Sequence, residues 1–327
     1  MTPRRTLLTS AASMLAAALL LPGAALAQAA YPNKPIKFIV PYAAGGLPDT
    51  VARIFAQRLT DRLGQSVVVE NKPGANGVVA AQAIASSPAD GYTFLVTDGS
   101  MFSINPAIYK SLSYEYKRDF VPVALAARAP LYLAVHPKTG VNTLQEFVAL
   151  AKSKPGTLNY GSSGIGSSHH LTMEAMKAAL GLDIQHVPFR GSALSVPALI
   201  GGQVDVAFSA LPSLSGFVKN NQVKLLASNA AARSAVAPGT PAIAEIVPGF
   251  DFAVIVGVLA ATGTPAAAVE RISAEIDKIA KTPETVQLLA NAGIEAVGSS
   301  PADYGRAITD ENDRLARAIK IAGIKQE

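Results

Sequence analysis

Two strand–loop–helix units constrain this fold more than any other feature of the sequence. The first begins with a strand over 36–40 that is short, β-branched and aromatic. A loop containing Gly45 and Gly46 follows, and then a helix with an apolar stripe, which we expect Asp49 or Thr50 to cap. This order leaves unpaired backbone N–H groups at a helix N-terminus, above the end of a strand.

The second unit lies over 158–181 and has the same order. A short strand, 158–160, leads into the loop 161–166, and we expect Ser167 or Ser168 to cap the helix that follows. Serines and glycines dominate the loop and the helix start, so hydroxyls and accessible N–H groups are both available as donors. We predict that the two loops face each other across a cleft and hold one small anion between them.

Strands and helices alternate along the rest of the chain, which favours parallel sheets with helices on both faces. Strands are expected over 66–70, 92–97, 121–128, 131–136, 184–187, 204–208, 223–227 and 294–297, and helices over 143–153, 265–280 and 301–321. In such sheets ligands bind in the loops after the strands, where both glycine loops lie. A chain of 327 residues, of which 50% are hydrophobic, is long enough for two domains.

The first 27 residues have the pattern of a signal peptide. An arginine pair precedes an apolar core over 7–21, and Ala25-Leu26-Ala27 forms a small-x-small cleavage site before Gln28. Polar residues interrupt the core, which argues against a membrane anchor. We therefore expect cleavage before Gln28 and a protein free in the periplasm, exported by either the general or the twin-arginine route.

Composition excludes several classes of function. Without Arg4 and Arg5 the chain has 26 basic and 23 acidic residues and no basic stripe, so nothing favours nucleic-acid binding. The absence of cysteine excludes disulfides and thiolate catalysis. No Walker loop, dinucleotide fingerprint or Gly-x-Ser-x-Gly elbow occurs. His169 and His170 are adjacent and have no carboxylate at ligand spacing, so we expect no metal and no cofactor. We expect His169 to line the cleft or the first turn of its helix.

Two further strand ends carry candidate contacts for an anion. Phe189-Arg190-Gly191-Ser192 follows the strand 184–187. It is either a plain loop and helix start or a set of N–H, hydroxyl and guanidinium donors. Ser209-Ala210 follows the strand 204–208 and is a candidate cleft wall.

Short motifs known from one family occur in order along the chain after residue 30. They include Tyr31-Pro-Asn-Lys-Pro-Ile, Ile39-Val-Pro-Tyr with Gly45-Gly46, Val69-Glu-Asn-Lys-Pro-Gly, Asp90-Gly-Tyr-Thr, Asn159-Tyr-Gly-Ser-Ser-Gly, Val187-Pro-Phe-Arg-Gly-Ser and Gly201-Gly-Gln-Val-Asp. With these motifs the chain resembles the substrate-binding proteins of tripartite tricarboxylate transporters, often called the Bug family. It departs from them at Asp98-Gly99, where small hydroxyl residues are usual, and at Ser209-Ala210, which replaces a common Asp-Asn pair. We therefore expect a less acidic, more apolar distal wall.

The resemblance implies an α/β fold of the type II periplasmic-binding-protein class, in which two lobes of mixed sheet, flanked by helices, enclose a ligand cleft. In that family the chain crosses between the lobes twice, here expected near 126–130 and near Phe252. Lobe 1 would then be 28–127 plus 253–327, and lobe 2 would be 128–252. The family holds a carboxylate with backbone N–H groups, hydroxyls and waters. The ligand-binding residues predicted in this way are Tyr42, Ala43, Gly45, Gly46, Asp49, Thr97, Gly99, Ser100, Ser162, Ser163, Gly166, Ser167, Ser168, Arg190, Gly191 and Ser209.

The leading interpretation is a periplasmic solute-binding protein. It would act as a monomer, capture a small organic carboxylate between the lobes and deliver it to integral membrane transporter subunits. An enzyme that acts on a small carboxylic acid in the same cleft is an alternative, although no nucleophile–base–orienter constellation supports it. A receptor that feeds a signalling system is a third interpretation.

We predict that the mature protein begins at Gln28, or within a residue or two of it, because the small-x-small site ends at Ala27. N-terminal sequencing of periplasmic material measures this directly. Retention of Met1 in that material would contradict the prediction.

Overall fold

The structure is a computed structural model that describes residues 31–42, 44–74, 77–189 and 191–323. The chain forms two units, residues 1–33 and 34–327. The expected signal peptide and its cleavage site before Gln28 lie outside the described residues.

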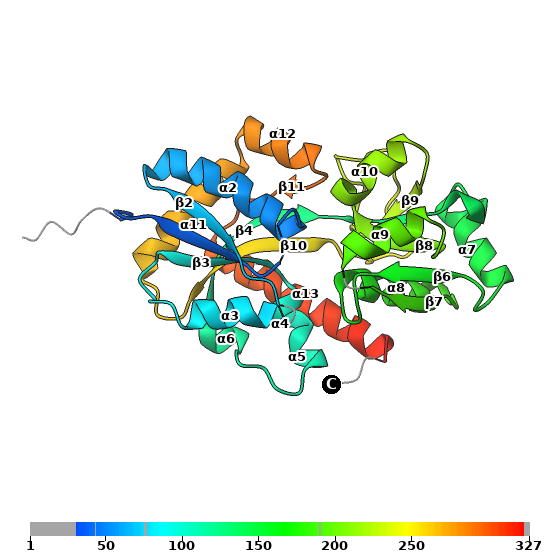
Figure 1. The fold of residues 1–327 in the computed structure, drawn as a ribbon, viewed down its shortest axis with the longest axis horizontal. Coiled ribbons are helices and arrows are strands. Elements are labelled where there is room, and N and C mark those ends of the chain that lie inside the picture. Colours follow the sequence, from blue (N-terminus) through cyan, green and yellow to red (C-terminus); the bar gives the residue numbers. More distant parts are fainter. Residues whose placement is uncertain (1–30, 43, 75–76, 190, 324–327) are drawn as a thin grey trace, which may run out of the picture. The chain divides into compact units, whose positions relative to one another are not determined.

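The first of two sheets has six strands in the order β11-β4-β10-β3-β1-β2 (Figure 1). They are β1 (Ile36–Val40), β2 (Val67–Asn71), β3 (Thr93–Asp98), β4 (Phe120–Ala129), β10 (Val254–Ala261) and β11 (Glu295–Ala296). β1 pairs in parallel with β2 and β3, whereas β10 runs antiparallel to both β3 and β4.

The second sheet has five strands in the order β7-β6-β8-β5-β9. They are β5 (Leu131–Val135), β6 (Asn159–Ser162), β7 (Gln185–Pro188), β8 (Val206–Ala210) and β9 (Lys224–Ser228). β6 is parallel to β7 and β8, and β5 is antiparallel to β8 and β9.

Both sheets are therefore mixed, as the family resemblance implied, and the expectation of parallel sheets was wrong for β5, β10 and β11, which run against their neighbours. The parallel pairs are those built from βαβ units, because parallel neighbours need a crossover connection. β4 runs instead into β5 through Pro130 alone, leaving the first sheet at Ala129 and entering the second at Leu131. β10 returns the chain to the first sheet. β5 and β10 each follow a connection that passes between the sheets, and both run antiparallel to their neighbours.

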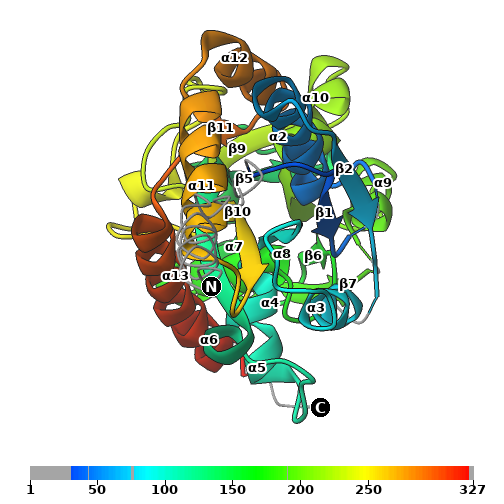
Figure 2. The ribbon, with the colours of Figure 1, turned by 90° about the vertical axis from the view of Figure 1, so that its left-hand side faces the viewer.

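Helices cover both faces of each sheet. In Figure 2, α2 and α3 lie on opposite sides of β1. The helices that accompany the first sheet are α2 (Leu47–Leu63), α3 (Val78–Ala85), α4 (Ser100–Ser103), α5 (Asn105–Ile108), α6 (Tyr116–Asp119), α11 (Ala266–Ala280), α12 (Pro283–Asn291) and α13 (Pro301–Ile321). Those that accompany the second are α7 (Leu144–Ser153), α8 (Ser168–Leu180), α9 (Ser192–Ile200) and α10 (Leu211–Lys219), with 3-10 turns η3 (Pro137–Thr139) and η4 (Ile243–Glu245).

Strand β5 shows how the second sheet is buried on both faces. Leu131, Leu133 and Val135 belong to one core, which includes residues of α7 and α8. Tyr132 and Ala134 belong to another, with residues of α9 and α10. Alternate residues of a strand point to opposite faces, so a strand covered on both sides is a continuous apolar run.

The terminal helix α13 contributes to the cores of both sheets. It contacts β4 of the first sheet and α8 of the second (Figure 1). Tyr304 and Ile308 are buried in the core of the first sheet, and Leu315 and Ile319 in that of the second. Their spacing of four residues is that of one helix face. α13 is therefore a third link between the two sheets, besides the strand crossings.

Glu311 lies on α13 between these two groups of apolar residues. It is 6% exposed, and its Oε2 atom has no hydrogen-bond partner among the described residues. Its carboxyl group lies so close to Gly99 that a Cβ there would overlap it. Burial raises the pKa of Glu311 to about 8, and the nearby charge of Asp98 acts in the same direction. Glu311 is therefore protonated at neutral pH.

We predict that Glu311→Gln makes the protein less sensitive to alkaline pH. The pKa of Glu311 is raised on folding from 4.5 to about 8, so the folded state holds a proton that the unfolded state loses between these values. The stabilisation is complete below pH 4.5 and is lost as pH rises through about 8, by on the order of a few kcal/mol. Glutamine cannot ionise, so the variant should retain stability over this window.

Thermal melts at pH 5 and pH 8.5 measure the difference. Glu270→Gln, an exposed position on α11, is the control and should follow the wild type. An identical loss of stability in wild type and Glu311→Gln would show that Glu311 is already ionised in the folded protein.

Candidate ligand-binding site

A cavity of about 700 Å³ lies at the carboxyl ends of parallel strands from both sheets. The loops that follow β1, β3, β6, β7 and β8 all contribute to its lining. This is where open α/β sheets bind ligands, because βα loops and helix starts gather at that edge. The two glycine loops predicted to face each other do so here, with Gly45 and Gly46 on one side and Ser163 on the other.

Four helices of nine or more residues begin at this cavity, besides the single-turn α4, which starts at Ser100. The lining includes Gly46 and Leu47 at the start of α2, Ser168 in α8, Ser192 in α9 and Pro212 in α10. The first N–H groups of a helix have no partner within it, and the helix dipole gives that end a partial positive charge. No lysine or arginine lines the cavity among the residues that the structure describes. The groups available here to attract an anion are backbone N–H groups and hydroxyls.

The start of α8 is held by its own loop. Ser167 is the N-cap, as predicted, and its Oγ accepts a hydrogen bond from the His170 N–H at 3.3 Å. The Gly166 N–H donates to His170 Nδ1 at 3.0 Å, which commits that glycine to the loop. Ser168 and His169 contribute the first N–H groups of the helix, and both residues line the cavity. They are the natural donors to an anion.

Two histidines fix the hydroxyls of this loop. Ser163 Oγ lies 2.7 Å from His169 Nδ1, and Ser162 Oγ lies 2.7 Å from His186 Nε2. The His186 ring stacks on His170 with centroids 4.1 Å apart. Burial lowers the pKa of both His169 and His186 to about 4, so both rings are neutral at pH 7. If His169 donates from Nδ1, the Ser163 hydroxyl proton remains free for a ligand.

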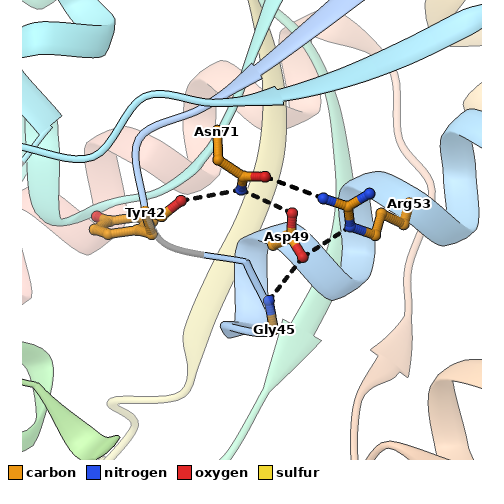
Figure 3. A network of polar contacts seen from close by, with 5 residues as sticks. All are labelled: Tyr42, Gly45, Asp49, Arg53 and Asn71. Atoms are coloured by element: carbon orange, nitrogen blue, oxygen red, sulfur yellow. Dashed lines mark hydrogen bonds and ion pairs between the residues drawn. The ribbon is translucent and has the colours of Figure 1, made fainter.

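On the opposite side, Asp49 ties the first glycine loop together (Figure 3). Its carboxylate accepts from the Gly45 N–H at 2.8 Å, from Arg53 Nε at 2.9 Å and from Asn71 Nδ2 at 2.8 Å. Asn71 also donates to the Tyr42 carbonyl at 3.0 Å. Burial alone would raise the pKa of Asp49, but the hydrogen bonds from Arg53, Gly45 and Asn71 outweigh it and lower that pKa.

The prediction that Asp49 or Thr50 caps α2 was wrong. The helix begins at Leu47, its N-cap is Gly46, and Pro48 occupies its first turn. Proline is tolerated there because its missing N–H would be unpaired in any case. Asp49 therefore lies inside the first turn and reaches back to the Gly45 N–H, which shapes the loop.

Asp98 and Ser100 bring the end of β3 to the same cavity. Tyr42 Oη donates to Asp98 Oδ1 at 2.8 Å, and the Ser100 N–H donates to the same oxygen at 3.0 Å. Ser100 Oγ lies 3.4 Å from Ser168 Oγ, so this loop reaches the start of α8. Burial raises the pKa of Asp98, against the effect of the hydrogen bonds from Tyr42 and Ser100.

The remaining wall of the cavity is mostly apolar. Its side chains come from β5, α9, α10, β10 and the segment before β11, and they are Leu131, Val196, Pro197, Phe217, Val254 and Ile294. Ser209 adds a hydroxyl that is fully buried and has no hydrogen-bond partner among the described residues. The sequence-based expectation of an apolar distal wall fits this lining.

The structure brings most of the predicted binding residues to one cavity. Those at its lining are Tyr42, Gly45, Gly46, Ser100, Ser163, Ser167, Ser168, Gly191 and Ser209. Five other predicted residues lie behind the lining: Asp49, Thr97, Gly99, Ser162 and Gly166. Of these, Asp49, Ser162 and Gly166 hold the loops in place by hydrogen bonds. Ala43 and Arg190 lie outside the described residues.

Two other lining residues were expected near the ligand. Asp98 lies within the segment 97–100, where contacts were predicted, and His169 was predicted to line the cleft or the first helix turn. Phe217 and Ile294 had no sequence signal, since they follow no glycine loop and reach the cavity only through packing of α10 and the segment before β11.

Two other properties of the described residues bear on function. No cluster of three or more histidine, cysteine, aspartate or glutamate side chains in them could hold a metal ion. None of their helices combines the length and apolar character that crossing a membrane requires.

The fold and cavity are those of a two-sheet α/β binding protein, and comparisons agree. The chain matches the family described as tripartite tricarboxylate transporter family receptor over residues 51–324. BugT of Bordetella pertussis is 32% identical over 297 residues, which cover 90% of this chain and 91% of that protein. The chain therefore belongs to this family, the TctC or Bug family of periplasmic solute-binding proteins.

Solved structures show the same fold. R. palustris Rpa4515, solved with adipate, has a TM-score of 0.84 and 32% identity, and the match covers 91% of this chain and 100% of that one. MatC from Rhodopseudomonas palustris, solved with bound malate, has a TM-score of 0.76 and 28% identity, with 88% and 100% covered.

We predict that Ser163→Ala weakens binding of a carboxylate roughly tenfold without abolishing it, because one hydrogen bond to a charged group among several is removed. Calorimetry with a ligand of the protein measures the change. Ser153→Ala, an exposed serine on α7, is the matched control and should bind as the wild type does. Unchanged binding in Ser163→Ala together with complete loss in Arg190→Ala would show that ion pairing, not N–H and hydroxyl donation, holds the anion.

Proposed function

We propose that this protein captures a small organic carboxylate in the cleft between two lobes and delivers it to the membrane subunits of a transporter. The lobes are the predicted ones, 28–127 plus 253–327 and 128–252. The observation that supports this most is the convergence of four helix N-termini on one cavity that no lysine or arginine lines among the described residues. Such a site binds a single small anion reversibly.

The expected affinity suits capture and release. A hydrogen bond to a charged group nets about 1.5–3 kcal/mol, and a favourable helix terminus adds about 0.3–1 kcal/mol. A few such contacts, less the cost of immobilising the ligand, give binding near the ~8 kcal/mol of a micromolar dissociation constant. The carboxylates in the structures of the adipate- and malate-bound relatives support this ligand class.

An enzyme in the same cleft is the second candidate, because Ser163 and His169 form a close pair. A nucleophilic serine needs a base whose pKa is near the working pH and whose second nitrogen is held by another group. The pKa of His169 is about 4, and no hydrogen bond to its Nε2 atom occurs among the described residues. The pair is better suited to orient a hydroxyl donor than to attack a substrate.

We propose further that the ligand draws the two lobes together. Ser100 follows a strand of the first sheet and Ser168 a strand of the second, and their Oγ atoms lie 3.4 Å apart. An anion that bridges the two loops would favour the closed state by its extra contacts. The hinge would lie at Pro130 and in the segment just before β10, where the chain passes between the sheets. α13 limits the motion, since it packs on both sides.

We predict that a bound carboxylate raises the melting temperature by roughly 5–10 °C at a hundredfold excess over its dissociation constant, from a stabilisation of about 2.7 kcal/mol. A thermal-shift screen of mono-, di- and tricarboxylates finds the ligand, and the corresponding carboxamides are the controls. Small-angle scattering on the best acid should show a smaller radius of gyration.

An unchanged radius with a tight ligand would contradict closure. Recovery of the acid after long incubation should show no chemical change, and conversion to a product would favour the enzyme.

A further inference from the structure

Asp98 is a carboxylate in a cavity whose other polar groups are arranged for anions. It lines the cavity and forms no ion pair with any residue that the structure describes. Two donors, Tyr42 Oη and the Ser100 N–H, hold its Oδ1 atom from one side. Burial raises the pKa of Tyr42 well above its usual value, so the phenol keeps its proton and acts as a donor.

Glu311 is the titratable neighbour behind Asp98, across Gly99. Of these two neighbouring carboxyl groups, Glu311 keeps the proton, because its Oε2 lacks any donor while Asp98 receives two hydrogen bonds. Two carboxyls this close do not both ionise readily. Asp98 therefore faces the cavity as a hydrogen-bond acceptor with a negative charge.

This acceptor lies beside the place where an anion is expected. The contact between Ser100 and Ser168 puts the Asp98 loop against the start of α8, whose free N–H groups attract a carboxylate. Two carboxylates side by side repel each other unless a donor lies between them. A hydroxyl or ammonium near the ligand's own carboxylate would supply that donor, and its hydrogen bond to Asp98 would be charge-assisted.

We propose that Asp98 is a specificity-determining residue, which selects acids that carry a hydrogen-bond donor, a hydroxyl or an ammonium, on the carbon next to the carboxylate. The inference rests on the proposed function, since it assumes a carboxylate at α8. Because the opposite wall is apolar, with Val196, Phe217 and Ile294, we expect the rest of the ligand to be uncharged. The ligand class is then 2-hydroxy or 2-amino acids with an apolar side chain.

A simpler role for Asp98 is to hold the Tyr42 hydroxyl in place. The two roles differ in what each variant does. If Asp98 acts only through Tyr42, Tyr42→Phe will have the same effect as removal of the Asp98 carboxylate. If Asp98 contacts the ligand, Tyr42→Phe will leave the preference among ligands intact.

The test is calorimetry with three acids of equal chain length: hexanoate, 2-hydroxyhexanoate and 2-aminohexanoate. Wild type should bind one or both of the last two at least roughly tenfold more tightly than hexanoate. Asp98→Ala should bring the ratios close to one. Tyr42→Phe and the surface control Asp61→Asn should retain them. Thermal melts check folding; if Asp98→Ala does not fold, Asp98→Asn should reduce the preference for 2-aminohexanoate roughly tenfold, because the charge is gone.

Hexanoate binding as tightly as the substituted acids would overturn the inference while leaving the proposed function in place. Loss of the preference in Tyr42→Phe as large as that in Asp98→Ala would reduce Asp98 to a positioning residue and would also overturn it. If no acid in this set or in the wider carboxylate screen binds, the proposed function itself fails.

Discussion

The structure depends on bringing helix starts, rather than basic side chains, to one edge of two sheets. α2, α8, α9 and α10 each follow a parallel strand or its loop, and each begins at the cavity. Because their partial charges belong to the backbone, the attraction for an anion is fixed when the sheets form. Such a site pays no side-chain entropy to organise its donors. The described residues also place no lysine or arginine at the cavity, where its charge would have to lose its water whenever the cavity lacked a ligand.

Neutral and internally paired side chains keep these helix starts in position. On one side, Asp49 satisfies both its oxygens within the loop and the neighbouring strand, with Arg53 balancing its charge. On the other side, the rings of His170 and His186 stack behind the loop and are uncharged. His170 Nδ1 accepts a hydrogen bond from the Gly166 N–H, and His186 Nε2 shares one with Ser162 Oγ. Each network leaves the local net charge near zero. Among the described lining residues, the field at the cavity is therefore set by the helices and by one exception, the carboxylate of Asp98.

The middle of α13 connects the Asp98 carboxylate to the rest of the fold. The helix contributes apolar residues to the cores of both sheets, and between them Glu311 lies behind Gly99 and near Asp98. Burial makes ionisation of this carboxyl group costly, so it is held protonated. The ligand cavity, the strand crossings and the terminal helix thus meet at one small region. A change of charge in this region therefore affects both the binding site and the stability of the link between the sheets.

The sequence alone determined the local elements and the chemistry of the loops. The period of apolar residues predicted α13 over 301–321 with its observed bounds, and the serine-rich loop predicted Ser167 or Ser168 as a cap, of which Ser167 is the observed one. Family motifs predicted the mixed α/β fold. Local patterns could not place Phe217, Ile294 or Glu311, because the partners of these residues lie far away in the chain. Nor could they show that Asp49 points away from the cavity and Asp98 into it. The direction of a carboxylate depends on which donors surround it, and only the packing of β1, β2 and β3 side by side brought Asn71 to the first and Tyr42 to the second.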